Sequence, residues 1–140
     1  VGVMPNLILD MEIGHEGISQ MIKTESMSER KTILINEAEA FIAMPGGFGT
    51  LDEFFEIIVL NQLRITDKPD ALYNTLNYYD SMIQFIDHAV SQGFIRKEHR
   101  DNIIINDNPE ILFKELSKHK SIDINQWIKD IKQETRNTDT

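Results

Sequence analysis

Three glycines within four positions, followed by a threonine and a glutamate, could form a phosphate site. They are Gly46, Gly47 and Gly49, with Thr50 next and Glu53 three residues later. Glycine lets the backbone take positive φ and lets a ligand approach without a Cβ in the way. Thr50 and Glu53 match a capping box, which predicts a helix with Thr50 as its N-cap. The start of that helix would attract phosphate through its N–H groups and the positive end of its dipole.

The same turn also has a purely structural interpretation. Many tight turns between a strand and a helix are glycine-rich and bind nothing, and a capping-box glutamate usually only caps. The turn is not a P-loop, because no Gly-Lys-Ser/Thr follows it, and it lacks the G-x-G-x-x-G spacing of dinucleotide sites. On composition alone, phosphate binding and an empty turn are equally good interpretations.

Arg30 and Lys31 are a second group with chemical potential. They fall in the first turn of another predicted helix, where cations oppose the helix dipole and an anion would compensate. Such a pair is more often a pair of solvent-exposed cations without a binding role. Glu12 lies in a polar, glycine-punctuated segment, residues 6–17, which reads as a solvated loop. The four histidines are scattered and predict no metal site; they are His15, His88, His99 and His119.

Short apolar segments alternate with helical ones along the chain. We expect strands at residues 1–4, 19–25, 40–44, 71–74 and 103–105, and helices at residues 26–38, 51–63, 80–93, 98–102 and 109–118. The apolar segment 40–44 is expected to be the central strand. This alternation predicts an α/β protein with a Rossmann-like, doubly wound parallel sheet and helices on both faces. Ligands bind beyond the carboxyl ends of strands in such sheets, and the 45–50 turn lies at one of these ends.

The chain divides into a predicted domain and a tail. Residues 1–120 are expected to form a single nucleotide-binding domain, and residues 121–140 a helical or partly disordered tail. Residues 1–5 read as a strand that lacks a preceding βα partner. We therefore expect one N-terminal βαβ unit, on the order of 30 residues, to be missing from this domain.

Net charge, cysteine content and hydrophobicity limit the kinds of molecule that this protein is expected to bind. The net charge is −9 over 140 residues, which argues against nucleic-acid and anionic-membrane binding. Any positive field for a phosphate must then be local. The chain has no cysteine, so disulfides, thiolate catalysis and Cys-ligated zinc are excluded. No long apolar run predicts a membrane span, and we expect a cytoplasmic protein.

Three sequence blocks together resemble one known family. Residues 45–53, PGGFGTLDE, resemble the PGGxGTxxE signature of the LONELY GUY family. Residues 26–31, SMSERK, resemble its SMxxRK helix start, and residues 9–15, LDMEIGH, resemble its DxEIGH-type loop. The order and spacing of the blocks also fit, and the similarity extends from residue 1 to about Ile95. Members are cytokinin riboside 5′-monophosphate phosphoribohydrolases, often labelled possible lysine decarboxylases.

The resemblance implies hydrolysis of the N-glycosidic bond of a nucleoside 5′-monophosphate, releasing a free base and ribose 5-phosphate. It assigns Arg30 and Glu53 as the catalytic pair. It also assigns the residues that bind substrate, which are Glu12, Lys31, Gly46, Gly47, Gly49 and Thr50. It implies no metal and no cofactor.

The resemblance also implies a homodimer, but it leaves the base open. The family usually has threonine and then tryptophan where this chain has Val59 and Leu60, near the base end of the pocket. A cytokinin riboside 5′-monophosphate and plain AMP are therefore both candidate substrates. The alternative is a nucleotide or molybdenum-cofactor carrier without catalysis, because related carriers share the scaffold.

Overall fold

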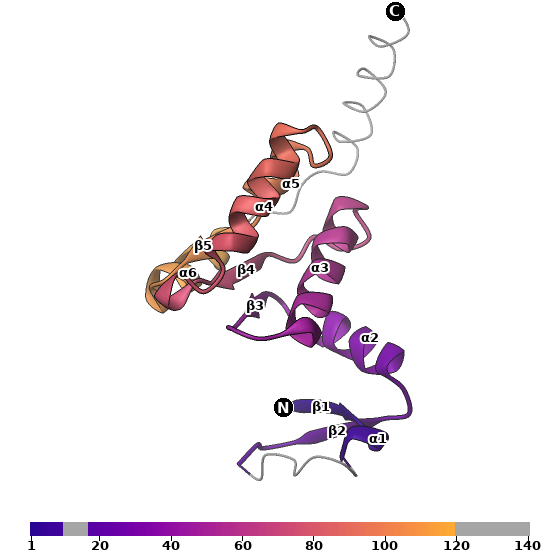
Figure 1. Ribbon diagram of the computed structural model, residues 1–140. Helices are drawn as coiled ribbons and strands as arrows, with labels where there is room; N and C mark the ends of the chain where they lie inside the picture. Colours follow the sequence, from indigo (N-terminus) through magenta and orange to yellow (C-terminus); the bar gives the residue numbers. More distant parts are fainter. Residues whose placement is uncertain (10–16, 120–140) are drawn as a thin grey trace, which may run out of the picture. The chain divides into compact units, whose positions relative to one another are not determined.

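The computed structural model describes residues 1–9 and 17–119 of the chain. These residues fall into two compact units, of which the first is Val1–Glu39 and the second begins at Ala40. Figure 1 labels the elements of both units. The predicted tail, residues 121–140, and the candidate Glu12 lie outside the described residues.

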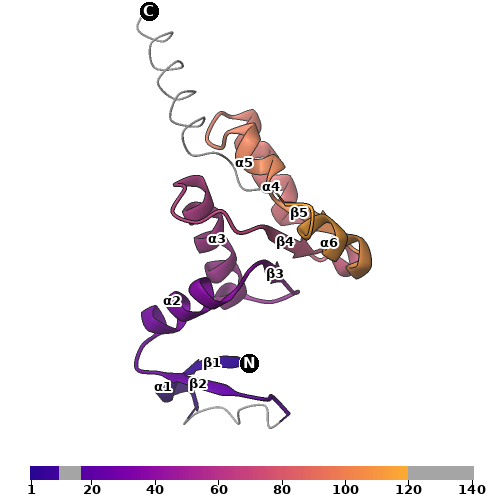
Figure 2. The ribbon, with the colours of Figure 1, turned by 180° about the vertical axis from the view of Figure 1, so that it is seen from behind.

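The first unit is a pair of parallel strands with a helix against them. Strand β1 (Gly2–Pro5) pairs with β2 (Met21–Thr24), and the register places Gly2 opposite Met21. Helix α2 (Met27–Glu37) packs on both strands (Figure 2). A short helix, α1 (Asn6–Leu9), follows β1, so the prediction of a loop from residue 6 is wrong for these four residues.

The α2 helix begins where the sequence predicts. Ser26 is its N-cap, and the Ser26 hydroxyl accepts a hydrogen bond from the Glu29 N–H at 3.1 Å. The Glu29 carboxylate accepts the Glu25 N–H at 2.7 Å, and its charge also favours the positive end of the helix. This double cap fixes where α2 starts.

The second unit contains a parallel sheet of three strands, with the order β3-β4-β5. Along the chain its elements are β3 (Phe41–Ala43), α3 (Phe48–Gln62), β4 (Asp70–Tyr73), the 3-10 turn η1 (Thr75–Asn77), α4 (Asp80–Ser91), α5 (Lys97–Asp101), β5 (Ile104–Asn106) and α6 (Pro109–Leu116). In this sheet β4 is the central strand, so the prediction that residues 40–44 are central is wrong. Local composition cannot show strand order, because pairing joins residues that are far apart in sequence.

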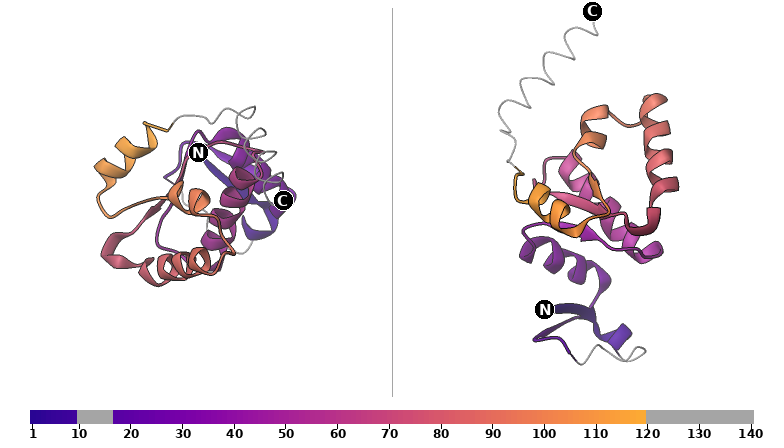
Figure 3. Two further views of the ribbon diagram at one scale, coloured as in Figure 1. Left: turned by 90° about the horizontal axis from the view of Figure 1, so that it is seen from above. Right: turned by 90° about the vertical axis from the view of Figure 1, so that its left-hand side faces the viewer.

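Side chains alternate across β4 and build a core on each face of the sheet. Leu72, fully buried, joins a cluster with Phe54 of α3 and Ile86 of α4. Ala71, also fully buried, faces the other way onto Leu112 and Leu116 of α6. Figure 3 shows α4 and α6 on opposite sides of this sheet. Helices on both faces of parallel strands make this an α/β, Rossmann-like fold, as predicted.

Two helix boundaries of the second unit match their sequence signals. Pro109 occupies the first turn of α6, and the Asn108 side chain accepts the N–H groups of Glu110 and Ile111. Gly93, just past α4, has φ of +79°, the left-handed conformation that ends helices. The described part contains no helix that is long and apolar enough to cross a bilayer. The single-domain assignment of residues 1–120 stays a prediction.

Candidate functional site

The glycine-rich turn joins β3 to α3 in the second unit. Gly47, not Thr50, is the N-cap of α3, with extended backbone at φ −95° and ψ −151°. The Leu51 N–H donates to the Gly47 carbonyl at 3.1 Å, which closes the first helical turn. The predicted capping box of Thr50 and Glu53 is therefore wrong. The helix starts earlier because the glycine-rich segment can already take the conformation of a cap.

Gly47 has no side chain with which to cap α3. The N–H groups of the first helical turn therefore receive no hydroxyl or carboxylate acceptor from the N-cap residue itself. Such donors, together with the helix dipole, suit an anionic ligand.

The three glycines differ in what surrounds them. A Cβ on Gly46 would lie 2.2 Å from the Thr50 hydroxyl oxygen, so Gly46 is required for packing inside the turn. A Cβ on Gly47 or Gly49 would meet no atom within 4 Å. These two glycines therefore border open space, and the open side of the turn has room for a ligand.

Glu53 follows the turn on the same helix. It is partly exposed and stands four residues after Gly49 and three after Thr50, so helical spacing puts all three on one face of α3. Side chains of a helix lean toward its N-terminus, which directs the Glu53 carboxylate toward the turn. A carboxylate beside a turn that suits an anion can stabilise a positively charged sugar.

Arg30 and Lys31 belong to the first unit. They are the fourth and fifth residues of α2. Lys31 was predicted in the first turn of this helix, but it lies beyond that turn. The Arg30 Nε donates to the Val3 carbonyl of β1 at 3.0 Å. This bond anchors the guanidinium group at the β1 strand.

The predicted site residues thus separate into three groups. Gly46, Gly47, Gly49, Thr50 and Glu53 come together in one turn and helix of the second unit. Arg30 and Lys31 lie in the first unit, and Glu12 is outside the described residues. The pairing of Arg30 with Glu53 stays a prediction.

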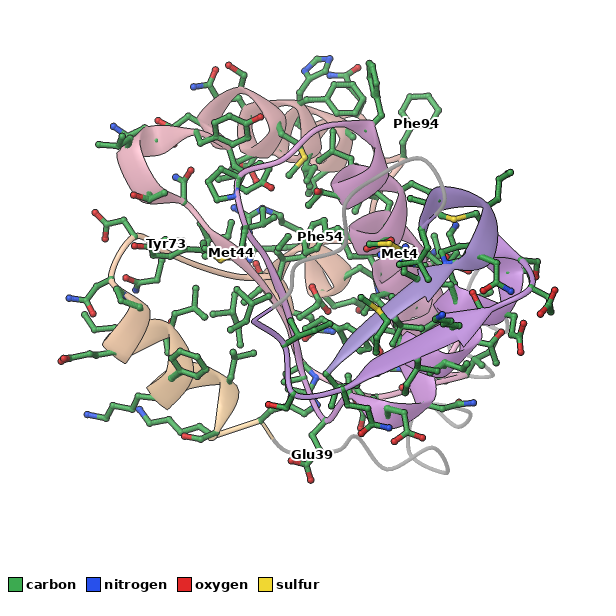
Figure 4. The ribbon with its side chains drawn as sticks, turned by 90° about the horizontal axis from the view of Figure 1, so that it is seen from below. Met4, Glu39, Met44, Phe54, Tyr73 and Phe94 are labelled. Atoms are coloured by element: carbon green, nitrogen blue, oxygen red, sulfur yellow. The ribbon has the colours of Figure 1, made fainter. Side chains whose placement is uncertain are left out.

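Two tyrosines that the sequence did not single out contact the turn. The Tyr78 hydroxyl donates to the Gly46 carbonyl at 2.9 Å, and the Tyr79 hydroxyl donates to the Met44 carbonyl at 2.5 Å. Figure 4 labels Met44, where the chain leaves β3. Burial raises the pKa of Tyr79, which keeps its phenol a hydrogen-bond donor. Both tyrosines follow β4, and the carboxyl ends of neighbouring parallel strands lie side by side, but the sequence alone does not show that β4 is the neighbour of β3.

A separate polar pocket lies at the amino end of β4. Asp70, only 3% exposed, accepts a hydrogen bond from the Asn61 amide at 2.9 Å. Burial raises the pKa of Asp70 to about 6, against the lowering effects of Asn61 and His119. His99 also lines this pocket, and burial lowers its pKa. Among the described residues, no group of three or more His, Asp or Glu could hold a metal ion.

Comparison with known proteins gives one family match. Residues 1–116 match the family model described as possible lysine decarboxylase. The match includes the turn, α3 and both tyrosines.

Several curated proteins are also similar. The chain is 39% identical over 119 residues to the probable cytokinin riboside 5′-monophosphate phosphoribohydrolase LOGL2 of Oryza sativa subsp. japonica, covering 85% of this chain and 49% of the relative. It is 45% identical over 104 residues to the similarly named LOGL5 of that species, covering 74% and 42%. It is 38% identical over 122 residues to the cytokinin riboside 5′-monophosphate phosphoribohydrolase LOG5 of Arabidopsis thaliana, covering 87% and 54%. The chain spans about half the length of these relatives.

Proposed function

We propose, from the premise that this chain belongs to the family described as possible lysine decarboxylases, that it hydrolyses the N-glycosidic bond of a nucleoside 5′-monophosphate. The products are a free base and ribose 5-phosphate. The names of the similar proteins specify a phosphoribohydrolase acting on a cytokinin riboside 5′-monophosphate, which supports this reaction class. Val59 and Leu60 leave the base open, so plain AMP is a candidate substrate beside the cytokinin nucleotide.

The observation that carries the proposal is the open turn in front of α3. Its N-cap residue, Gly47, makes no side-chain cap hydrogen bond, and a Cβ on Gly47 or Gly49 would meet no atom within 4 Å. Glu53 stands on the same helix face as Gly49. In the proposed complex the backbone N–H groups and Thr50 hydroxyl bind the 5′-phosphate, and the sugar extends toward Glu53.

The proposed chemistry follows from the charge of the transition state. Cleavage of an N-glycosidic bond passes through a sugar with oxocarbenium character, so a nearby carboxylate lowers the barrier. Glu53 supplies that carboxylate and positions the attacking water. Arg30 and Lys31 supply positive charge for substrate anions. Arg30 suits this role because its planar guanidinium group can donate two parallel hydrogen bonds to a phosphate. Glu12 contacts the ribose or the base.

We also propose that the protein acts as a homodimer in the cytoplasm. One face of α3 and its C-cap residue expose apolar side chains at helical spacing, with Phe55 at 37%, Val59 at 49% and Leu63 at 57% exposure. Contiguous apolar side chains on a surface helix favour burial against a partner. The isologous contact of a two-fold dimer would cover this stripe on both copies.

The test is release of ribose 5-phosphate from AMP and from N6-isopentenyl-AMP by the 140-residue chain. Glu53→Gln keeps the size of the side chain and removes its charge, and we expect it to reduce kcat at least about 100-fold. Asp52→Asn is the matched control, because it removes a carboxylate from the adjacent, exposed position of the same helix. We expect the control to retain activity, and the ratio of the two substrates gives the base preference.

Binding of AMP measured by calorimetry separates the outcomes. Nucleotide binding without base release would overturn the hydrolase proposal and favour the carrier. Equal loss of activity in Glu53→Gln and Asp52→Asn would overturn the assignment of Glu53.

A further inference from the structure

The connection between β4 and α4 reaches across to the glycine-rich turn. Tyr78 and Tyr79 stand 32 and 35 residues from the carbonyl groups that accept their hydroxyl hydrogens, those of Gly46 and Met44. Tyr79 is buried, whereas Tyr78 is 54% exposed. Their rings meet edge to face with centroids 4.9 Å apart. The two phenols therefore hold the turn at its entry and at its centre.

The bond to Gly46 fixes the direction of one particular peptide group. In a trans peptide the C=O and the following N–H point in opposite directions. Because the Gly46 carbonyl points at Tyr78, the Gly47 N–H points away from Tyr78. The hydrogen bond of Tyr78 consequently sets the orientation of a donor in the turn.

Without the hydrogen bond from Tyr78, the peptide group between Gly46 and Gly47 could change its orientation easily. It joins two glycines, and glycine adopts positive and negative φ with similar ease, so the peptide plane can flip. A flipped plane would exchange the positions of the N–H and the C=O. A carbonyl oxygen would then face the open space beside Gly47, and it would repel a phosphate there.

The backbone between β4 and α4 is bent to bring the tyrosines into place. Leu76 and Asn77 both have left-handed backbone, with φ of 51° and 60°, and Leu76 is 95% exposed. Such a conformation is unfavourable for a non-glycine residue such as Leu76. Asn74 compensates, because its side chain accepts the Tyr79 N–H at 2.7 Å and donates to Asp80 at 2.8 Å. Strain that is held by a local network is typical of functional segments.

We propose that Tyr78 is a positioning residue that locks the Gly46–Gly47 peptide so that its N–H, and not its carbonyl, faces the bound 5′-phosphate. Tyr79 fixes the start of the turn through Met44 and supports Tyr78 through the ring contact. This inference rests on the proposed function, because it needs a phosphate at the turn. It adds a residue that binds no substrate atom itself and acts through the backbone.

The decisive variant is Tyr78→Phe, which removes the hydroxyl and keeps the ring. Tyr78 is half-exposed, so this variant retains the core. We expect its Kd for AMP to rise about threefold to tenfold, the range of a single net hydrogen bond, while its Kd for adenosine stays at the wild-type value. In steady-state kinetics KM for AMP should rise more than kcat falls. Tyr73→Phe, a tyrosine packed on the opposite face of the sheet, is the matched control and should bind AMP as the wild type does.

Each outcome decides between the two proposals. Equal AMP affinity in Tyr78→Phe and wild type would overturn the positioning role and leave the hydrolase proposal intact. Weakened AMP binding in Tyr78→Phe, without base release by the wild type, would keep the positioning role and overturn the hydrolase. A parallel loss of AMP and adenosine affinity would show a general structural role and also overturn the inference. A wild type that binds neither AMP nor inorganic phosphate would overturn both proposals.

Discussion

At the scale of single residues, the glycines of the turn have two different reasons to be glycine. Gly46 has no room for a methyl group, because the stiff, β-branched Thr50 occupies the position of its Cβ. Gly49 has room for one, and it lies inside a helix, where glycine is disfavoured. Packing against Thr50 therefore explains why residue 46 is glycine. For Gly49, the contacts within 4 Å give no such reason.

We predict opposite effects from two alanine substitutions. Gly46→Ala should lower the free energy of unfolding by about 1–3 kcal/mol, because the new methyl displaces Thr50. Gly49→Ala should raise it by about 0.5–1 kcal/mol while weakening AMP binding, because its methyl enters the open space of the turn. Urea denaturation and calorimetric titration with AMP measure the two quantities. Gly49→Ala with unchanged AMP affinity would contradict a phosphate at this position.

At the scale of elements, sequence patterns located most helices and strands but not the contacts between them. Pro109 and Gly93 marked helix ends correctly, because caps depend on a few adjacent residues. The start of α3 was placed three residues late, because Thr50 and Glu53 have capping-box spacing although Gly47 begins the helix. The glycine-rich turn itself was visible, because its three glycines fall within four adjacent positions. Tyr78 was not, because a hydrogen bond over 32 residues leaves no local pattern.

The amino end of β4 gives the second unit a pH-dependent stability. Asp70 has a pKa of about 6 in the folded state and near 3.8 when unfolded. Between these values the folded protein holds a proton that the unfolded chain has released, so the free energy of unfolding falls as pH rises from about 4 to about 6. The full change is about 3 kcal/mol.

Asp70→Asn tests this assignment. Asparagine keeps an oxygen to accept the Asn61 bond and carries no charge, so the variant should lose this pH dependence and be more stable than wild type at pH 7. Denaturant unfolding at pH 4, 5, 6 and 7 measures the effect. Asp107→Asn, at an exposed position, is the control and should keep the wild-type slope. An unchanged slope in Asp70→Asn would show that other groups cause it.

At the scale of the whole molecule, the candidate residues are distributed over both compact units. The turn and Glu53 belong to the second unit, and Arg30 and Lys31 to the first. Neither unit alone holds every charge that the proposed reaction uses. Sequence resemblance could name these residues because each block is short and continuous. It gave no strand order and no division into units, which depend on contacts between distant segments.

The exposed stripe on α3 predicts the oligomeric state. Val59→Lys places a charge at the centre of the stripe, and we expect the dimer dissociation constant to rise at least about tenfold, because an ammonium group is costly to bury without a partner. Analytical ultracentrifugation measures this change. Phe113→Lys, at a 63% exposed position on α6, is the control and should leave the dimer intact. A wild type that sediments as a monomer at about 50 µM would contradict the dimer proposal.

The bare glycine at the start of α3 links the substrate to the folding of the chain. A serine or aspartate at position 47 would stabilise the start of α3 by roughly a few tenths of a kcal/mol relative to glycine, and this chain forgoes that gain. With a phosphate bound, the ligand itself becomes the missing cap. Under the proposed function, phosphate binding and the stability of the ligand-free protein are in opposition at this backbone position, so a side-chain cap at residue 47 should stabilise the free protein and weaken phosphate binding.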